Sequence, residues 1–288
     1  MPMTLRASAK RRRAIGYLAG SIGTVLIALS LLGDFTPLGQ YSNDAPRSWE
    51  SFDPEKVTRE RSLAALRHDA RTRLDDFESA TSEAQMLALF ETTTTRFSHS
   101  DGARYTIFSN WILAAAGLLN RNFSVIRDPE RMVAGGHSLI CSQSSYLLLT
   151  LARQEGIKVR HVGLDGHVVM EAWYDGAWHM FDPDQEVIAR TEDGSIASVD
   201  DLAERSDLLE SAYAQPNQRN LIPIIASQAN NSFVSYPEGA RFVWTADVLA
   251  HVERSTAVLK YVLPLLLVLV GFALLKGAAW PVSRQHHR

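Results

Sequence analysis

The apolar positions of the chain are concentrated in two uncharged segments, one near each end. Residues 14–32 carry no charged side chain, and these 19 residues are enough for a helix to cross about 30 Å of hydrocarbon. Residues 261–275 are also uncharged, and extending this run back to residue 255 adds only Lys260, whose long side chain can reach the membrane surface. The pattern predicts transmembrane helices over residues 14–33 and 255–275.

Basic residues flank both segments on their outer sides. Residues 10–13 are all basic, and Lys276, Arg284 and Arg288 follow the second segment. Because basic flanks stay in the cytoplasm, we expect residues 1–13 and 276–288 there, in a bacterial inner membrane, with the middle of the chain facing the periplasm. Two alternatives stay open. The alternative for the first segment is a cleaved signal peptide, although the segment is longer than the apolar region of such a peptide and lacks its cleavage pattern. The alternative for the second segment is a buried or interfacial helix.

The middle of the chain begins with a linker and continues with helical spacing. Residues 34–54 contain three prolines, which is typical of a linker. Apolar side chains then recur at helical intervals over residues 55–79, and Ser82 with Gln85 resembles a capping box that opens a second helix. A third helical run covers residues 105–119. We assign these apolar faces to packing.

From residue 141 onward the pattern predicts a buried helix followed by three strands. Residues 146–152 are apolar nearly all round, the helix that they predict has Cys141 in its first turn, and Gly156 is typical of a helix end. Strand-like alternation follows in three segments, 157–162, 167–174 and 178–181. Asp175 and Gly176 form a hairpin signal between the last two. We therefore expect an α+β domain over residues 55–254, with a helix packed on an antiparallel sheet and a core at 105–184.

Charge and cysteine content restrict the function classes. The whole chain has a net charge of −3 and its two basic ends contribute +8, so residues 34–275 carry −11. Nucleic-acid binding needs a basic surface, and the acidic middle argues against it. The acidic middle of the chain does not favour contact with anionic lipid either. The single cysteine excludes an internal disulfide and a cysteine-rich metal site.

Three residue types that together make a thiol catalytic site lie at the ends of the predicted elements. Cys141 begins the helix, where the positive end of the helix dipole stabilises a thiolate. His167 begins the second strand and Asp182 ends the third, so the hairpin places them at the same edge of the sheet. A carboxylate there can orient the imidazole toward the thiol. Each residue alone has an ordinary structural explanation, but together they predict a Cys–His–Asp triad.

Residues 141–183 resemble the core of the transglutaminase-like superfamily of papain-fold cysteine enzymes. The similarity lies in the cysteine that heads a helix, in the run Gly166-His167-Val168-Val169 and in Phe181-Asp182-Pro183, and it covers about residues 105–184. It implies a transglutaminase-like, papain-like fold without cofactor or metal. Cys141 would be the nucleophile, His167 the general base and acid, and Asp182 the orienting carboxylate. The family commonly has glycine two residues before the cysteine, where this chain has Leu139.

The resemblance implies acyl transfer on a protein or peptide of the cell envelope. If water releases the acyl group, the protein is a protease or amidase. If an amine releases it, the protein is a transglutaminase. The sequence does not distinguish between these two acceptors. The Cys141 backbone N–H would hold the oxyanion with a second donor, for which Asn110 and Trp111 are candidates. Glu171, on the same strand face as His167, is a candidate for tuning the site. Asp184 is an alternative to Asp182.

Two further readings belong to other functional classes. The side chains of His161, His167, His179 and Asp182 offer ligands for a metal ion, although no HExxH or CxxC spacing accompanies them. The same fold without catalysis would be a membrane-tethered binding or scaffold module. Some transglutaminase-like proteins belong to envelope or exopolysaccharide systems, which implies machinery of that kind as a partner. An unreactive thiol would favour the binding module.

Overall fold

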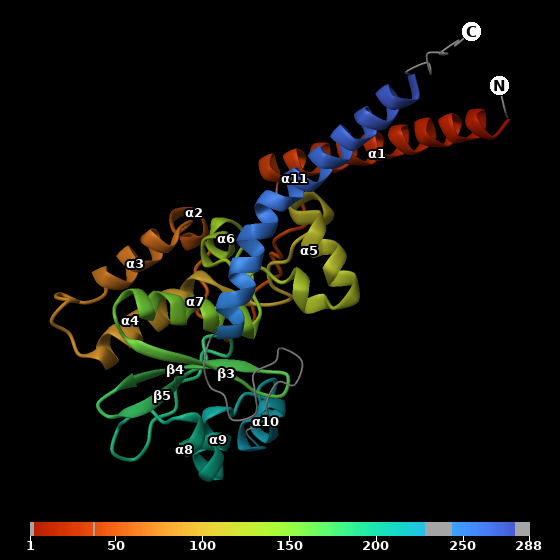
Figure 1. Ribbon diagram of the computed structural model, residues 1–288. Helices are drawn as coiled ribbons and strands as arrows, with labels where there is room; N and C mark the ends of the chain where they lie inside the picture. The colour runs from red at the N-terminus through yellow and green to blue at the C-terminus, as the bar shows by residue number, and fades with distance from the viewer. Residues whose placement is uncertain (1–2, 37, 228–243, 280–288) are drawn as a thin grey trace, which may run out of the picture. The chain divides into compact units, whose positions relative to one another are not determined.

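The computed structural model describes residues 3–36, 38–227 and 244–279, and it is an α+β structure, mostly helical with a small antiparallel sheet (Figure 1). Its residues group into two compact units. The terminal-helix unit comprises residues 1–40, 105–124 and 254–288, and the α+β unit comprises residues 41–104 and 125–253. Residues 105–124, which we expected in the domain core, therefore group with the terminal helices.

In the terminal-helix unit, α1 (Met3–Phe35) packs against the later part of α11 (Trp244–Ala279). Windows at Ala9–Phe35 and Asp247–Gly277 are long and apolar enough to cross a membrane. Glycines allow the two helices to approach closely, because a Cβ added at Gly23 would lie 2.5 Å from the Pro264 carbonyl oxygen. Both helices extend beyond the predicted spans.

Lys260, whose side chain we expected to reach the membrane surface, is paired within the terminal-helix unit. Its side chain is 2% exposed, and its Nζ lies 2.5 Å from Asp34 Oδ1 and 2.9 Å from the Ser109 carbonyl oxygen. A buried ammonium group is stable only when it is paired and hydrogen-bonded. These contacts also join α11 to α1 and to α5 (Ile107–Leu119), which is followed by the short helix η1 (Arg121–Ser124).

In the α+β unit, three strands form an antiparallel sheet in the order β3-β4-β5. They are β3 (Lys158–Gly163), β4 (Val168–Tyr174) and β5 (Ala177–Phe181). The predicted hairpin turn is present, since Asp175 and Gly176 have φ values of 50° and 81° and Trp173 pairs with Trp178. Two successive positive φ values are typical of a type I′ turn, which matches the twist of the strands it joins.

The sheet is covered on both faces. On one face it contacts α4 (Ser82–Arg96) and α7 (Cys141–Gln154). Ser145 Oγ donates to the Val168 carbonyl oxygen at 2.9 Å, and the rings of Phe90 and Phe181 lie 6.0 Å apart. On the other face, Val169 and Met180 pack into a hydrophobic cluster with side chains of the later helices. Those helices are α8 (Val199–Glu204), α9 (Ser206–Ala212), η2 (Arg219–Leu221) and α10 (Ile222–Ser227). The helices over residues 199–227 thus complete this part of the core.

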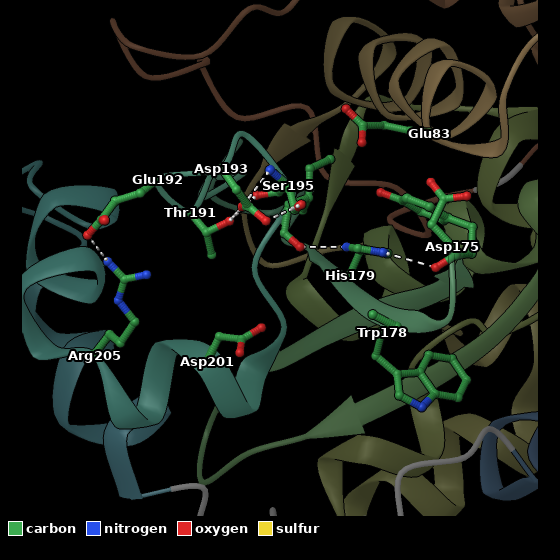
Figure 2. Close-up of a pocket in the computed structure, with 13 residues that line it drawn as sticks. Glu83, Asp175, Trp178, His179, Thr191, Glu192, Asp193, Ser195, Asp201 and Arg205 are labelled. Atoms are coloured by element: carbon green, nitrogen blue, oxygen red, sulfur yellow. Dashed lines mark hydrogen bonds and ion pairs between the residues drawn. The ribbon is translucent and has the colours of Figure 1, made fainter.

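A pocket of about 480 Å³ lies beside the β4–β5 turn (Figure 2). Carboxylate side chains are frequent in its wall, but several have structural partners, such as Asp201, which accepts a hydrogen bond from the Ser198 hydroxyl at 2.7 Å. His179 in the wall faces two carbonyl oxygens, at 2.5 and 3.2 Å from its ring nitrogens. None of the predicted catalytic residues lines this pocket.

The α+β unit begins with α2 (Lys56–Arg59), α3 (Leu63–Thr72) and α4 (Ser82–Arg96). The single helical run predicted over 55–79 is therefore two helices, with the later residues in turns. The capping prediction at Ser82 is wrong by one residue. The N-cap is Thr81, whose hydroxyl accepts a hydrogen bond from the Ala84 N–H at 3.2 Å.

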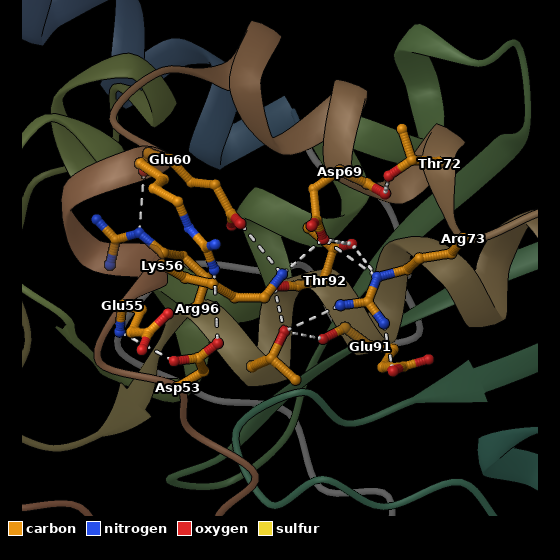
Figure 3. Close-up of polar contacts among 12 residues, drawn as sticks. Asp53, Glu55, Lys56, Glu60, Asp69, Thr72, Arg73, Glu91, Thr92 and Arg96 are labelled. Carbon is orange, nitrogen blue, oxygen red and sulfur yellow. Dashed lines mark hydrogen bonds and ion pairs between the residues drawn. The ribbon is translucent and has the colours of Figure 1, made fainter.

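A buried polar network ties these helices together (Figure 3). Lys56 Nζ lies 3.1 Å from Glu60 Oε1 and 2.7 Å from Asp69 Oδ2, and Asp69 also accepts a hydrogen bond from the Thr92 hydroxyl. Nearby, Arg96 is fully buried. Its guanidinium donates to the carbonyl oxygens of three residues on other segments: Glu60 at 2.9 Å, Gly136 at 3.0 Å and Val133 at 3.2 Å.

Candidate active site

Cys141 is the first residue of α7 (Cys141–Gln154), as the sequence predicted. The chain reaches it through α6 (Pro129–Ala134) and β2 (Ser138–Leu139). β2 pairs in parallel with β1 (Ser98–His99), which lies about 40 residues earlier. Cys141 itself is partly exposed. A partly exposed thiol at a helix N-terminus is accessible to a substrate and lies in a positive electrostatic environment.

The first turn of α7 is fixed by Gln143. Its Oε1 accepts hydrogen bonds from the N–H groups of Ala103 and Ile140, at 3.1 and 3.3 Å, and its Nε2 donates to the Ala103 and Ile126 carbonyl oxygens at 2.8 Å. Gly102, with a φ of +74°, lies so close that an added Cβ would be 2.2 Å from Gln143 Oε1. Close backbone packing therefore holds the segment that follows β1 against the start of this helix.

His167 and Asp182 lie at the same edge of the sheet, immediately before β4 and immediately after β5. His167 Nε2 is 2.7 Å from Asp182 Oδ2, and both side chains are almost fully buried. The Cys141 side chain lies close enough to His167 to interact electrostatically with its ring. The structure therefore brings together the three residues of the predicted triad.

The surroundings of His167 favour the imidazolium form. Burial alone would lower its pKa, but the charge and hydrogen bond of Asp182, with a smaller contribution from Cys141, raise the pKa of His167 well above its usual value. An imidazolium beside the sulfur is the partner that a nucleophilic thiolate requires. The geometry is thus suited to nucleophilic attack by sulfur and to proton transfer by the ring.

Asp182 is held by more donors than His167 alone. The Tyr213 hydroxyl donates to Asp182 Oδ2 at 2.8 Å, and the backbone N–H groups of Asp184 and Gln185 donate to Oδ1 at 3.2 Å. Burial and the adjacent Asp182 charge raise the pKa of Tyr213, which keeps its proton on the hydroxyl. Sequence reasoning missed Tyr213, because it lies 31 positions from Asp182 at the end of a helix without any local motif.

Asp184 does not replace Asp182 as the partner of His167. Its Oδ1 lies 2.5 Å from Nδ1 of His99, and its Oδ2 accepts a hydrogen bond from Gln185 Nε2 at 2.7 Å. The Asp184 side chain is 1% exposed and that of His99 is 24% exposed. No sequence signal distinguished His99, which the parallel pairing of β1 with β2 brings to the site.

Asn110, Trp111 and Glu171, the predicted supporting residues, have other partners. Asn110 Nδ2 donates to the Thr256 hydroxyl at 2.9 Å, and Trp111 Nε1 donates to the Lys260 carbonyl oxygen at 3.0 Å, both within the terminal-helix unit. A role for either in holding an oxyanion stays a prediction. Glu171 is fully buried and accepts hydrogen bonds from Arg160 Nε at 2.5 Å and the Val199 N–H at 2.9 Å. These contacts join Glu171 to β3 and to the start of α8, and its role in tuning the site stays a prediction.

The four metal ligands considered from the sequence are not brought together as a set. Burial lowers the pKa of His161 to about 3, and its ring lies 6.0 Å from that of Tyr146. Among the described residues, the group with suitable ligand atoms consists of His167, Asp182 and Asp184, all within 4.8 Å of one another. A metal there would have to displace the proton between His167 and Asp182.

Comparison with known proteins adds no relative. No protein-family model, no curated protein and no solved structure matches the chain.

Proposed function

We propose that this protein is a membrane-anchored thiol acyl-transfer enzyme of the transglutaminase-like superfamily, acting on a protein or peptide substrate outside the cytoplasm. One observation carries the proposal: buried His167 is hydrogen-bonded to Asp182 and interacts electrostatically with the side chain of the only cysteine, at the start of a helix. The two long apolar helices support membrane attachment. The basic residues that flank these helices support an orientation with both chain ends in the cytoplasm and the α+β unit outside it.

In the proposed reaction, the Cys141 thiolate attacks the carbonyl carbon of an amide, and the negative charge moves to the carbonyl oxygen. The Cys141 backbone N–H, at the helix N-terminus, stabilises that oxygen. The C–N bond then breaks as His167 gives its proton to the departing amine, which leaves a thioester on sulfur. Water or a second amine loses a proton to His167 and attacks the thioester, and this step restores the thiolate. Asp182 keeps the ring oriented throughout.

The test uses the full chain in detergent and measures alkylation of its single thiol by iodoacetamide from about pH 4 to 10. We expect rapid alkylation well below the range in which an ordinary thiol ionises, near pH 8.5. His167→Gln, which retains side-chain volume, should remove the low-pH reactivity. Near-ultraviolet circular dichroism would establish that this variant is folded.

A matched control is His68→Gln on α3, outside the triad, which should leave the profile unchanged. Alkylation with a single midpoint near pH 8.5, identical in the wild type and in His167→Gln, would exclude the triad. The tethered binding module would then be the better reading. If the low-pH reactivity is present, peptides and amines are the substrates to screen for hydrolysis and for cross-linking.

A further inference from the structure

Two histidine–carboxylate pairs lie side by side beside the Cys141 helix. His167 is paired with Asp182, and His99 is paired with Asp184, at 2.7 and 2.5 Å respectively. The Asp184 N–H also donates to Asp182 Oδ1 at 3.2 Å, so the two carboxylates belong to one turn. Ligand atoms of His167, Asp182 and Asp184 all lie within 4.8 Å of one another. Asp184 is thus close enough to affect His167.

A buried carboxylate in this position is a competitor of Asp182. Like Asp182, it can accept the Nε2–H of His167, and a ring that turned toward it would change its position relative to the Cys141 sulfur. Two neighbouring carboxylates also repel each other unless each has a partner. In the structure both oxygens of Asp184 are occupied, Oδ1 by His99 and Oδ2 by Gln185.

We propose that His99 is a positioning residue of the active site, which acts by holding Asp184 and thereby leaves Asp182 as the sole carboxylate partner of His167. This inference rests on the proposed function, because it concerns the orientation of the general base. His99 acts through Asp184 and is not itself a reacting group.

The backbone around His99 is built to keep it in place. Its N–H donates to Glu50 Oε1 at 2.9 Å, and the residue pairs with Leu139 in the parallel β1–β2 ladder. On the carboxylate side, Glu186 accepts two hydrogen bonds from Ser51, at 2.8 Å from its N–H and 2.6 Å from its hydroxyl. The segment predicted to be a linker therefore fixes both His99 and the turn that carries Asp184.

The test is a double-mutant cycle on the full chain, with the rate of Cys141 alkylation between pH 4 and 10 as the readout. We expect His99→Ala to slow alkylation at pH 6 by about tenfold, in the range usual for coupled neighbours. Asp184→Asn alone should have little effect. The combination of His99→Ala with Asp184→Asn should return the rate to within about twofold of the wild type, because the competing charge is then absent.

A conservative variant separates positioning from general destabilisation. His99→Asn keeps an N–H donor near the place of Nδ1 and should preserve the wild-type profile. The inference is overturned if His99→Ala alkylates like the wild type, if removing the Asp184 charge fails to restore the rate, or if His99→Asn is as slow as His99→Ala. Each variant is compared with the wild type, whose thiol must itself react at low pH for the comparison to apply. A wild type without that reactivity would instead overturn the proposed function.

Discussion

Arg96 provides the sharpest test of how the α+β unit holds the segment that leads to Cys141. Its side chain is fully buried, and burial lowers its pKa to about 10. Its hydrogen bonds go to the carbonyl oxygens of Glu60, Val133 and Gly136. Val133 lies in α6 and Gly136 lies between α6 and β2, so the guanidinium joins that segment to α4 and to the chain after α2.

Arg96→Met keeps much of the apolar stem but leaves three carbonyl groups without their donor. Each buried carbonyl group that loses its partner lowers the stability by about 1–3 kcal/mol. Removal of the buried guanidinium charge offsets part of the total for the three groups. We therefore expect the free energy of unfolding to fall by about 3–5 kcal/mol. For a unit of this size, that corresponds to a decrease in Tm of roughly 6–20 °C.

The assay is thermal unfolding of the full chain in detergent, followed by circular dichroism. Arg59→Met is the matched control, since its guanidinium is 3.7 Å from Asp53 and the side chain is 61% exposed. The control should change stability by less than about 0.5 kcal/mol. A Tm for Arg96→Met within about 2 °C of the control would refute the reasoning, because it would mean that the three carbonyl groups find other partners.

Two further predictions concern the triad. Tyr213→Phe removes one donor from Asp182 and should lower the free energy of unfolding by about 1.5–3 kcal/mol. Because His167 still pairs with Asp182, low-pH alkylation of Cys141 should persist, and a loss as complete as in His167→Gln would contradict this division of roles. The raised pKa of His167 contributes stability that is fully present below its unfolded pKa of about 6.5 and is lost as the pH rises through the higher folded value. Denaturation at several pH values should therefore show a decline above about pH 6.5 that is smaller in His167→Gln, and equal slopes would contradict it.

Local patterns in the sequence were sufficient to predict the elements that carry the candidate site. The helix that begins at Cys141 and the hairpin that turns at Asp175 and Gly176 both follow from apolar periodicity and turn residues. Apolar periodicity and turn residues depend on neighbours close in the sequence, and each pattern is satisfied within one or two secondary-structure elements. The hairpin register alone places His167 and Asp182 at the same edge, which explains why this pair could be predicted without a relative.

Contacts between segments far apart in the chain could be found only in the tertiary structure. The parallel pairing of β1 with β2 brings His99 to Asp184, and the return of α9 to the sheet brings Tyr213 to Asp182. The same holds for Lys260, whose partner Asp34 lies 226 residues away in the chain. The composition of the chain near these residues does not encode such partners. They are selected by packing, because a buried polar group must find a hydrogen-bonding partner wherever the fold supplies one.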